Sequence, residues 1–577
     1  MVSDPTRRTS HRPPIQARHY AVASGHYLAT AAAVRLLDAG GNAVDAGVAA
    51  GICINILLPD LTSFGGVAPT IVYQAESGQI RSISGLGYWG EEANADIFQR
   101  EHDSQIPLGA RRSVVPGAAD SWLTSLARYG SKSFAEVVQP ALELCEEGFV
   151  VYPSLHRNLT READTIRRWP STAAIFLPNG QPPAVGDVLY QRDLGQTFRR
   201  MIEAERQASG RGRVAGVEAA RDEFYTGGIA RQMVDFIHAE GGFLTLADMA
   251  EFHSDVEEPP HSSFRDIEVY AVGPWSQGPS LLQALNILEG YDLKGMGVNS
   301  ADYVHVVSAA LDLAFSDREA YYGDPKFVDV PLAALLSKEY AARQRARIRP
   351  DRAWSTMPEP GDPLGQGARR PAAEPSDLHA PIQPDTSYVC VVDREGNAFS
   401  ATPSDGIGGT PVIPGLGLIC SGRGSQTWLQ PEHASALQPR KRPRLTPNPA
   451  LAMRDGKLLM PFGTPGGDMQ VQSMAQVFLN IVEFGMDPQE AIEQPRFGTF
   501  NHPDSFWPHH YRPGLVQLES RIPGEVAASL QARGRNTQLW PEWTRITGNV
   551  CAILVDHARG TLTAGADARA EAYAAGW

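Results

Sequence analysis

Hydrophobic residues in the first 350 positions recur mostly with the spacing of an α-helix. Residues 28–39 show this spacing and stop at Gly40 and Gly41, a common signal for a helix end. Asn42 is able to cap a second helix over residues 43–57, which is apolar nearly all round and is therefore expected to be buried. Ser131 is expected to cap a helix that ends near Glu147. Other predicted elements are helices over 229–239, 279–288 and 301–322 and short strands over 71–73 and 80–83.

The pattern changes after residue 385, where short apolar segments separated by turns predict β-strands. The predicted strands cover 386–393, 398–402, 416–420, 450–453, 458–462, 515–518, 549–555 and 562–565. Helices are predicted over 469–484, 488–494 and 524–533. Helices packed outside stacked antiparallel sheets are the simplest architecture for this combination.

Three segments lack a regular pattern. Residues 1–20 are polar and basic without the apolar core of a signal peptide, so a disordered lead is expected. The Gly/Ala/Arg-rich segment 207–220 is expected to be a surface excursion. The many prolines over about 350–385 exclude a regular helix or a central strand. An exposed, extended linker is therefore expected to end where the strand at Thr386 begins.

Composition narrows the class of protein. Hydrophobic residues make up 42% and charged residues 20% of the 577 residues, as in globular chains with a large core. The net charge of −14 argues against a nucleic-acid partner. No run of 18 or more apolar residues occurs, so no membrane span is expected, and with no signal peptide we expect a cytoplasmic protein. The five cysteines lack CxxC spacing and are expected to be small core residues, neither disulfide-bonded nor zinc-bound.

Thr386 is a candidate nucleophile because its hydroxyl stands at the start of a predicted strand, directly after the proline-rich run. If the Asp385–Thr386 bond breaks, the new α-amino group, with a reference pKa of roughly 7.7–8.0, can act as the base for the hydroxyl of the same residue. The hydroxyl can make this break itself by attacking the Asp385 carbonyl, an N-to-O acyl shift followed by hydrolysis. The alternative is that Thr386 is an ordinary β-branched residue that starts a strand.

Gly466 and Gly467 stand just before the predicted helix 469–484. Free N–H groups at a helix start favour negative charge, and two of them aimed at one oxygen would form an oxyanion hole. The alternative is a strand-to-helix turn that needs glycine for its shape.

Two further motifs are weaker. The glycines over 406–409 and 415–417 lack the strand–loop–helix context of a nucleotide site. His502, His509 and His510 lie in an aromatic segment, 501–511, without the spacing of a metal site, so a surface or pocket-rim insert is favoured. No metal and no cofactor is expected.

Taken together, the motifs resemble the γ-glutamyltransferase family of N-terminal nucleophile hydrolases, from about residue 21 to the C-terminus. They lie at 40–46, 115–117, 222–225, 323–325, Thr386 with 391–393, 441–443 and 465–467. The resemblance implies a four-layer αββα sandwich, cleaved between Asp385 and Thr386 into a large subunit (21–385, after the lead) and a small subunit (386–577) that share one fold. It implies Thr386 as nucleophile and, through its freed amine, base. It further implies that Ser404 supports the nucleophile and that Gly466 and Gly467 form the oxyanion hole.

The sequence departs from the family's pattern where the donor's amino acid is held. The arginine that binds the α-carboxylate has no counterpart over 84–88, Gln426 is the nearest match to the aspartate that binds the α-amino group, and one of the family's paired serines falls on Thr446. Arg423 can hold a carboxylate by a bidentate pair, although it can equally be a solvated loop residue. We therefore expect an acyl donor with a carboxylate and no free amine, of the oxamate or glutaryl-amide type.

Two other functions stay open. One is a true γ-glutamyl hydrolase or transpeptidase that acts on glutathione-like substrates. The other is an unprocessed, non-catalytic binding protein. The expected partners are a small-molecule amide and the two subunits of one precursor, with a heterotetramer or a higher homo-oligomer left open. The sequence does not decide between hydrolysis and transfer to an acceptor amine.

Overall fold

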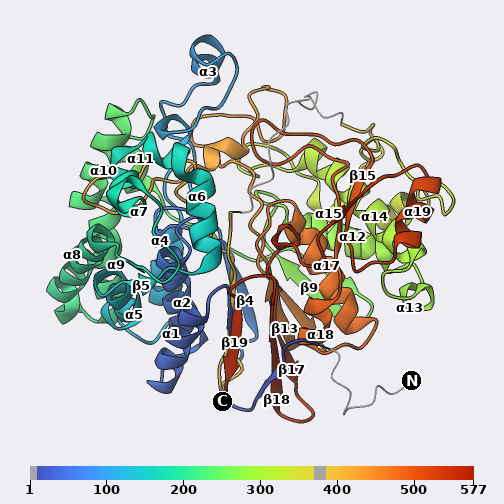
Figure 1. Ribbon diagram of the computed structural model, residues 1–577, viewed down its shortest axis with the longest axis horizontal. Coiled ribbons are helices and arrows are strands. Elements are labelled where there is room, and N and C mark those ends of the chain that lie inside the picture. Colours follow the sequence, from blue (N-terminus) through green and yellow to red (C-terminus); the bar gives the residue numbers. More distant parts are fainter. Residues whose placement is uncertain (1–9, 370–384) are drawn as a thin grey trace.

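The computed structural model describes residues 10–369 and 385–577. Two seven-stranded sheets pack face to face at the centre, and helices cover the outer face of each sheet (Figure 1). This arrangement is the predicted four-layer αββα sandwich.

The first sheet mixes strands from both parts of the chain. Its order is β19 (Tyr573–Gly576), β2 (Ala21–Ser24), β10 (Val389–Val392), β11 (Ala398–Ala401), β3 (Thr70–Gln74), β4 (Gln79–Ile83) and β7 (Val256–Glu257). β10 pairs antiparallel with β2 on one side and with β11 on the other, and β11 pairs with β3. The residues before and after Thr386 therefore build one sheet together.

The second sheet has the order β1 (Ile15–Ala17), β18 (Thr561–Ala566), β17 (Cys551–Asp556), β13 (Lys457–Gly463), β12 (Ala450–Arg454), β9 (Ile267–Ala271) and β8 (His261–Phe264). An apolar layer that includes Tyr388, Cys390, Leu451 and Ile553 fills the space between the two sheets. A Cβ atom on Gly463 would lie 2.3 Å from the Tyr388 ring, so the sheets approach closely just beside Thr386.

Helices from residues 27–251 cover the outer face of the first sheet (Figure 1). They are α1 (Tyr27–Asp38), α2 (Ala43–Leu57), α4 (Ala118–Tyr129), α5 (Phe134–Glu146), α6 (Pro153–Arg167), α7 (Pro170–Phe176), α8 (Arg192–Ala208), α9 (Arg213–Tyr225), α10 (Gly228–Ala239) and α11 (Leu246–Glu251), with α3 (Ala95–Glu101) further out. Buried α2 packs directly on β10 and β11 and begins at the predicted cap, Asn42, whose side chain accepts from Val44 and Asp45.

The second sheet is covered mainly by α12 (Gly278–Leu288), α14 (Ala301–Tyr321), α17 (Met469–Val482) and α18 (Pro488–Glu493). Smaller elements complete this half: α13 (Leu293–Met296), α15 (Leu332–Leu335), α16 (Lys338–Arg345), α19 (Gly524–Ala532), and the sheet of β14 (Phe497–Thr499), β15 (Leu515–Glu519) and β16 (Asn536–Trp540). A two-stranded sheet, β5 (Phe149–Val150) and β6 (Val188–Leu189), lies among the helices of the other half.

Several sequence predictions are wrong in detail. Segment 207–220 is more regular than expected: it contains the end of α8 and most of α9, joined by an exposed turn at 209–212. Its Ala and Arg residues are compatible with helix despite the glycines. The cap of α5 is Ser133 and not Ser131, since Ser133 forms a reciprocal capping box with Glu136. Residues 416–420 form no strand and make a single bridge, between Val412 and Ile419.

The predictions of a disordered lead and an exposed linker are each wrong for part of the segment. Residues 15–17 of the lead form edge strand β1, which pairs with β18, whereas residues 1–9 lie outside the described residues. In the linker, Pro358 and Gly361 are buried against α14, where Ser316 donates to the Pro358 carbonyl at 2.6 Å. Its start is therefore packed, and residues 370–384 lie outside the described residues.

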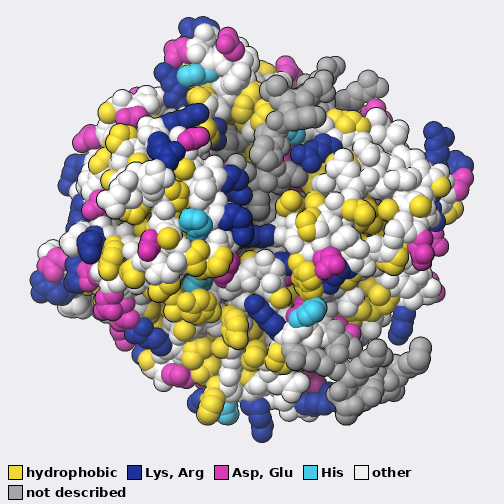
Figure 2. Space-filling model, in the orientation of Figure 1, with side chains coloured by type: hydrophobic (Ala, Val, Ile, Leu, Met, Phe, Trp, Pro, Cys, Tyr) yellow, Lys and Arg dark blue, Asp and Glu magenta, His cyan; other side chains and the backbone are white. Residues whose placement is uncertain are grey.

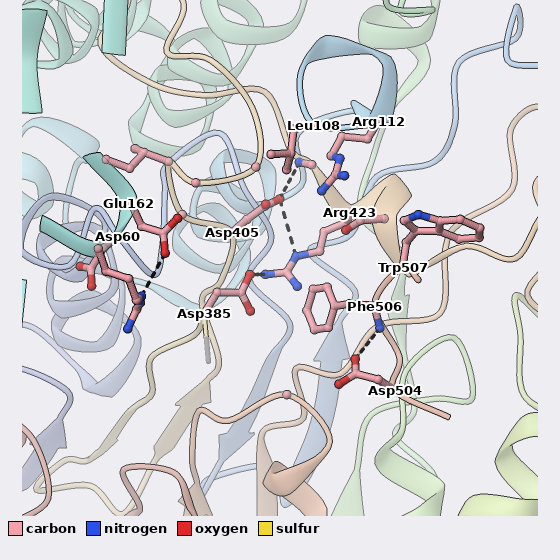
Figure 3. Close-up of a pocket in the computed structure, with 18 of the residues that line it drawn as sticks. Asp60, Leu108, Arg112, Glu162, Asp385, Asp405, Arg423, Asp504, Phe506 and Trp507 are labelled. Atoms are coloured by element: carbon pink, nitrogen blue, oxygen red, sulfur yellow. Dashed lines mark hydrogen bonds and ion pairs between the residues drawn. The ribbon is translucent and has the colours of Figure 1, made fainter. Parts of the chain in front are cut away.

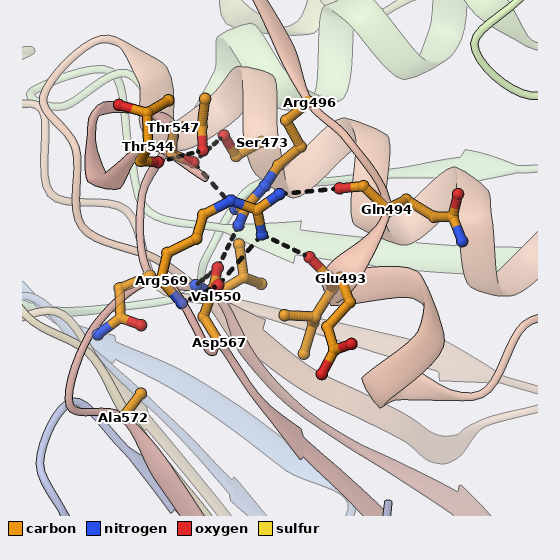
Figure 4. Close-up of polar contacts among 12 residues, drawn as sticks. Ser473, Glu493, Gln494, Arg496, Thr544, Thr547, Val550, Asp567, Arg569 and Ala572 are labelled. Atoms are coloured by element: carbon orange, nitrogen blue, oxygen red, sulfur yellow. Dashed lines mark hydrogen bonds and ion pairs between the residues drawn. The ribbon is translucent and has the colours of Figure 1, made fainter. Parts of the chain in front are cut away.

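A buried ionic network fixes the chain after β18 (Figure 4). The Asp567 carboxylate lies between the guanidinium groups of Arg496 and Arg569, and Arg569 also pairs with Glu519 at 2.6 Å. Arg569 donates to the Gln494 carbonyl at 3.0 Å, which ties the C-terminal segment to the end of α18. Burial by itself raises the pKa of Asp567, but Arg496 and Arg569 outweigh it and hold that pKa below its usual range.

Composition led to two predictions, one about the cysteines and one about membrane-spanning helices. All five cysteines are buried and none is in a disulfide, as expected for core residues. Among the helices of 10–369 and 385–577, none combines the length and the apolar character needed to cross a bilayer.

Candidate active site

The hydroxyl of Thr386 lies beside the peptide bond that precedes it. Thr386 stands just before β10 and is 1% exposed. Its Oγ1 donates to the Asp385 carbonyl oxygen and shares a hydrogen bond of 2.7 Å with the Ser404 hydroxyl. The nucleophile candidate, its supporting hydroxyl and the carbonyl it would attack therefore form one cluster.

Pairing of the strands brings Ser404 to this place. Ser404 follows β11, and its N–H donates to the Val67 carbonyl at 2.9 Å, while Ser387 donates to the Pro403 carbonyl at 2.9 Å. The Ser404 hydroxyl donates to the Asp385 carbonyl oxygen at 2.5 Å. The two hydroxyls and the carbonyl oxygen thus form one hydrogen-bonded cluster, in which two protons serve three contacts.

Arg423 is the cation of this cluster (Figure 3). It lies in a short 3-10 helix, Arg423–Gln426, and its side chain is 1% exposed, so the solvated-loop interpretation is wrong. Its Nη2 donates to the Asp385 carboxylate at 2.6 Å and also to the Ser404 hydroxyl. The Phe506 ring lies 5.1 Å from the guanidinium carbon, and the Asp405 carboxylate lies 3.7 Å from Nε.

Two carboxylates flank Arg423. Burial raises the pKa of Asp385 to about 7; Arg423 opposes this shift and Asp405 adds to it. Burial also raises the pKa of Asp405, whose carboxylate accepts from the Ser421 hydroxyl at 2.6 Å and from the Gly422 N–H at 3.0 Å. Asp405 is thus held in place by the loop that carries Arg423, whereas the side-chain group that holds the Asp385 carboxylate is Arg423.

Gly466 and Gly467 form the turn between β13 and α17. Their φ angles of +126° and +56° lie in the region that favours glycine. Within the described residues neither N–H donates a hydrogen bond to another group. Gln277, which the sequence analysis missed because it belongs to no motif, donates to the Gly467 carbonyl at 2.9 Å and holds the turn. Of the two, Gly467 lines the cavity that Asp385 and Arg423 also line, whereas Gly466 lines a neighbouring small pocket with Met469 and Phe500. An oxyanion hole at this turn would need both N–H groups to point at one oxygen.

Gln426 and Thr446 lie behind Arg423 and are both buried. Gln426 accepts from Arg423 Nη1 at 3.4 Å and donates to the Thr446 hydroxyl at 3.2 Å. Neither is among the described residues that line the cavity. The structure thus connects them to the site through Arg423 and not through the cavity wall.

Asp385 and Arg423 line a cavity of about 330 Å³, whereas Thr386 and Ser404 are buried behind them and are not among its described lining residues (Figure 3). Asp385, Asp405, Arg423 and Gly467 lie in its wall. Helix α6 contributes Leu159, Arg161, Glu162 and Ile166, and the 501–511 segment contributes Asp504, Phe506, Trp507, Pro508 and His510; Asp60, Leu108, Arg112, 406–409, Gly422, Ser425 and Asp468 complete the lining. The cavity is thus polar and carries both signs of charge.

The 501–511 segment forms one wall of the cavity, and its His502 and His509 side chains are buried. His509 stacks on Trp428 with ring centroids 3.8 Å apart, and burial lowers its pKa to about 4. His502 packs against Phe315 at 4.0 Å. In the described part of the chain, no group of three or more His, Cys, Asp or Glu side chains is placed to hold a metal ion.

The gamma-glutamyltranspeptidase family model matches residues 29–577. The chain is 32% identical to the glutathione hydrolase-like YwrD proenzyme of Bacillus subtilis, over 96% of this chain and 98% of that protein. It is 33% identical to the acylase ACY 1 proenzyme of Pseudomonas sp. (strain SE83), over 98% and 94%. The crystal structure of cephalosporin acylase from Bacillus halodurans superposes with a TM-score of 0.86 at 28% identity, over 100% and 99%.

Proposed function

Since this chain belongs to the gamma-glutamyltranspeptidase family of N-terminal nucleophile hydrolases, which act on amides, we propose that it is an autoprocessing amidohydrolase with Thr386 as its nucleophile. The observation that carries the proposal is the contact of the Thr386 hydroxyl with both the Asp385 carbonyl oxygen and the Ser404 hydroxyl. The relatives named proenzymes support a precursor that is cleaved into two subunits. In this proposal the large subunit ends at Asp385 and the small subunit begins at Thr386.

Self-cleavage would use the cluster as it stands. Thr386 Oγ1 attacks the Asp385 carbonyl carbon, the Oγ1–C bond forms, the C–N bond to Thr386 breaks, and the hydroxyl proton passes to the nitrogen. Water then hydrolyses the ester, which leaves a carboxylate on Asp385 and restores the Thr386 hydroxyl beside a free α-amine. Ser404, at 2.5 Å from the carbonyl oxygen, would stabilise the charge that develops there.

Substrate cleavage would repeat the same chemistry on an external amide. The free amine of Thr386 takes the hydroxyl proton as Oγ1 attacks and delivers it to the leaving amine. The N–H groups of Gly466 and Gly467 would donate hydrogen bonds to the oxyanion, a contribution of roughly 3–4 kcal/mol for each well-placed donor. Water then releases the acyl group.

The charge of the site supports an acyl donor with a carboxylate. Arg423 is buried and already pairs with a carboxylate, that of Asp385, at 2.6 Å. The nearest acid besides Asp385, Asp405, is engaged by Arg423, Ser421 and Gly422 and so offers no open partner for an ammonium. Figure 2 shows Lys and Arg side chains near the centre of this face of the molecule. The acylase names among the relatives agree with this substrate class.

A γ-glutamyl donor is the second candidate. Asp504 lines the same cavity, and its carboxylate accepts only from the Phe506 N–H at 2.8 Å among the described contacts. It offers a place for an ammonium group, and the glutathione hydrolase-like relative points the same way.

Two substrates that differ by one ammonium group separate these candidates. We expect kcat/KM for glutaryl-p-nitroanilide to exceed that for γ-glutamyl-p-nitroanilide at least tenfold. We expect Arg423→Met to lower the glutaryl rate at least tenfold, with the processed fraction measured in parallel. A preference for the γ-glutamyl compound would establish the second candidate instead.

A further inference from the structure

The residue before the scissile bond is held at both ends like an acyl substrate. Its carbonyl oxygen accepts from the hydroxyls of Thr386 and Ser404. Its side-chain carboxylate pairs with Arg423 at 2.6 Å. Two carbons, Cα and Cβ of Asp385, separate these two groups, so the held fragment has the skeleton of a succinyl group.

We propose that Asp385 occupies the acyl subsite of the mature enzyme, and that the subsite takes succinyl-type monoamides, whose carboxylate is two carbons from the reacting carbonyl. Arg423 would serve twice: it first positions Asp385 for self-cleavage and then binds the carboxylate of the substrate. This inference rests on the proposed function, since it requires Thr386 to be the nucleophile in both reactions.

Chemistry links the two reactions. Self-cleavage forms an ester between Thr386 Oγ1 and the Asp385 acyl carbon, and substrate cleavage forms an ester between the same oxygen and the substrate acyl carbon. In each case one C–N bond breaks, one C–O bond forms and the hydroxyl proton ends on the departing nitrogen. An acyl group that extends from this carbon towards Arg423 therefore starts from the same point.

The far end of the subsite is also fixed. Arg423 contacts Asp405 at 3.7 Å, Gln426 at 3.4 Å and the Phe506 ring at 5.1 Å. With its guanidinium held in this way, the distance from nucleophile to cation sets the length of the acyl chain. One carbon more or fewer changes the chain by about 1.5 Å of bond length, which a buried ion pair at 2.6 Å tolerates poorly.

Departure of Asp385 would leave a charge to be compensated. Arg423 is 1% exposed, and a buried cation without its hydrogen-bonded partner is unfavourable. The Asp385 Oδ1 atom has no hydrogen-bond partner among the described residues, so the ion pair of Oδ2 with Arg423 is the contact that a substrate carboxylate would have to replace. A substrate carboxylate would restore the pair.

The first test measures acyl length directly. Wild-type processed enzyme is assayed with malonyl-, succinyl-, glutaryl- and adipyl-p-nitroanilide, with butyryl-p-nitroanilide as the uncharged match for succinyl. We expect kcat/KM to peak at succinyl, at least threefold above either neighbour, and to exceed that for butyryl at least tenfold. A peak at another length, or a flat series, would overturn the inference while leaving the proposed function intact. Absence of self-cleavage and of turnover with every anilide would instead remove the proposed function.

The second test concerns self-cleavage. Asp385→Ala and Asp385→Glu are each expected to slow the appearance of the two subunits at least tenfold, because one loses the ion pair and the other lengthens it. Glu359→Ala, an exposed acid upstream in the same linker, is the matched control and is expected to process like wild type. Normal processing of both Asp385 variants, with a normal melting temperature, would contradict a positioning role.

Discussion

At the scale of single residues, the chemistry depends on one carbonyl oxygen and the hydroxyls around it. Ser404 donates to the Asp385 carbonyl oxygen at 2.5 Å and shares a 2.7 Å hydrogen bond with Thr386. We expect Ser404→Ala to slow self-cleavage about 100- to 1,000-fold, the usual loss when a donor to a developing oxyanion is removed. Time courses on denaturing gels measure this rate. Self-cleavage at the wild-type rate would show that Ser404 takes no part.

The rate of self-cleavage should also depend on pH through Asp385. Its carboxylate faces Arg423 and Asp405, with Arg112 beside Asp405, and its pKa is raised to about 7, by burial first. Only the ionised form makes the ion pair with Arg423, so we expect the rate to rise as pH increases through about 7 and then to level off. Asp385→Asn should remove this step from the profile. An unchanged profile in that variant would assign the titration to another group.

Only some of the residues at this site could be predicted from the sequence. Thr386, Gly466 and Gly467 stand in sequence motifs, and Ser404 is implied by the family resemblance; the structure places Thr386 and Ser404 in contact. The pairing of Arg423 with Asp385 could not be predicted, because it depends on a loop folding back over 38 residues. Gln277 was missed for a similar reason: an isolated glutamine carries no sequence signal, and only the packing of α12 against the 466–467 turn gives it a role.

At the scale of elements, strand and helix positions were predicted best where the hydrophobic period was long and uninterrupted. The α2 helix begins at its predicted cap and ends at its predicted residue. Short segments were less predictable: 416–420 has the composition of a strand but makes only one bridge, since no neighbouring strand is available to pair with it. Strand β1 was missed because its ladder with β18 is formed by residues far away in the sequence.

The ionic network after β18 connects several elements, and we expect it to contribute to the stability of the fold. Asp567 is fully buried between Arg496 and Arg569 (Figure 4). We expect Asp567→Asn to lower the free energy of unfolding by roughly 3–5 kcal/mol, because it leaves buried guanidinium groups without their counter-charge. Urea denaturation followed by fluorescence measures this change. Asp556→Asn is the control: Asp556 is half-buried, its partner Arg559 is exposed, and an asparagine Oδ1 can still accept from the Ala558 and Arg559 N–H groups, so stability should change by less than about 1 kcal/mol.

The same network predicts how the stability of the folded protein changes with pH. Because the pKa of Asp567 is lowered in the folded state, its contribution is complete above the ordinary pKa of about 3.9 and is lost as pH falls through the folded-state value. The difference in stability between wild type and Asp567→Asn should therefore shrink in acid. A difference that stays constant down to pH 2 would argue that packing, and not charge, is responsible.

At the scale of the whole molecule, the four-layer architecture follows from the sequence, whereas the interleaving of its two parts required the structure. Strands β10 and β11 come after Thr386 but lie between β2 and β3, which come before it. Cleavage at residue 385 would therefore cut one chain without separating two domains. We expect the subunits to remain associated under native conditions and to separate only on denaturation. Size-exclusion chromatography that resolves two independent fragments in native buffer would contradict this arrangement.

The most direct measurement is intact mass with N-terminal sequencing of purified wild-type protein beside Thr386→Ala, each assayed for amide hydrolysis. We predict that wild type is active and consists of two fragments, the smaller one beginning Thr-Ser-Tyr-Val. We predict that Thr386→Ala stays a single chain of about 62.5 kDa without activity. Full activity in a wild-type preparation that remains one uncut chain, or in the alanine variant, would contradict the account.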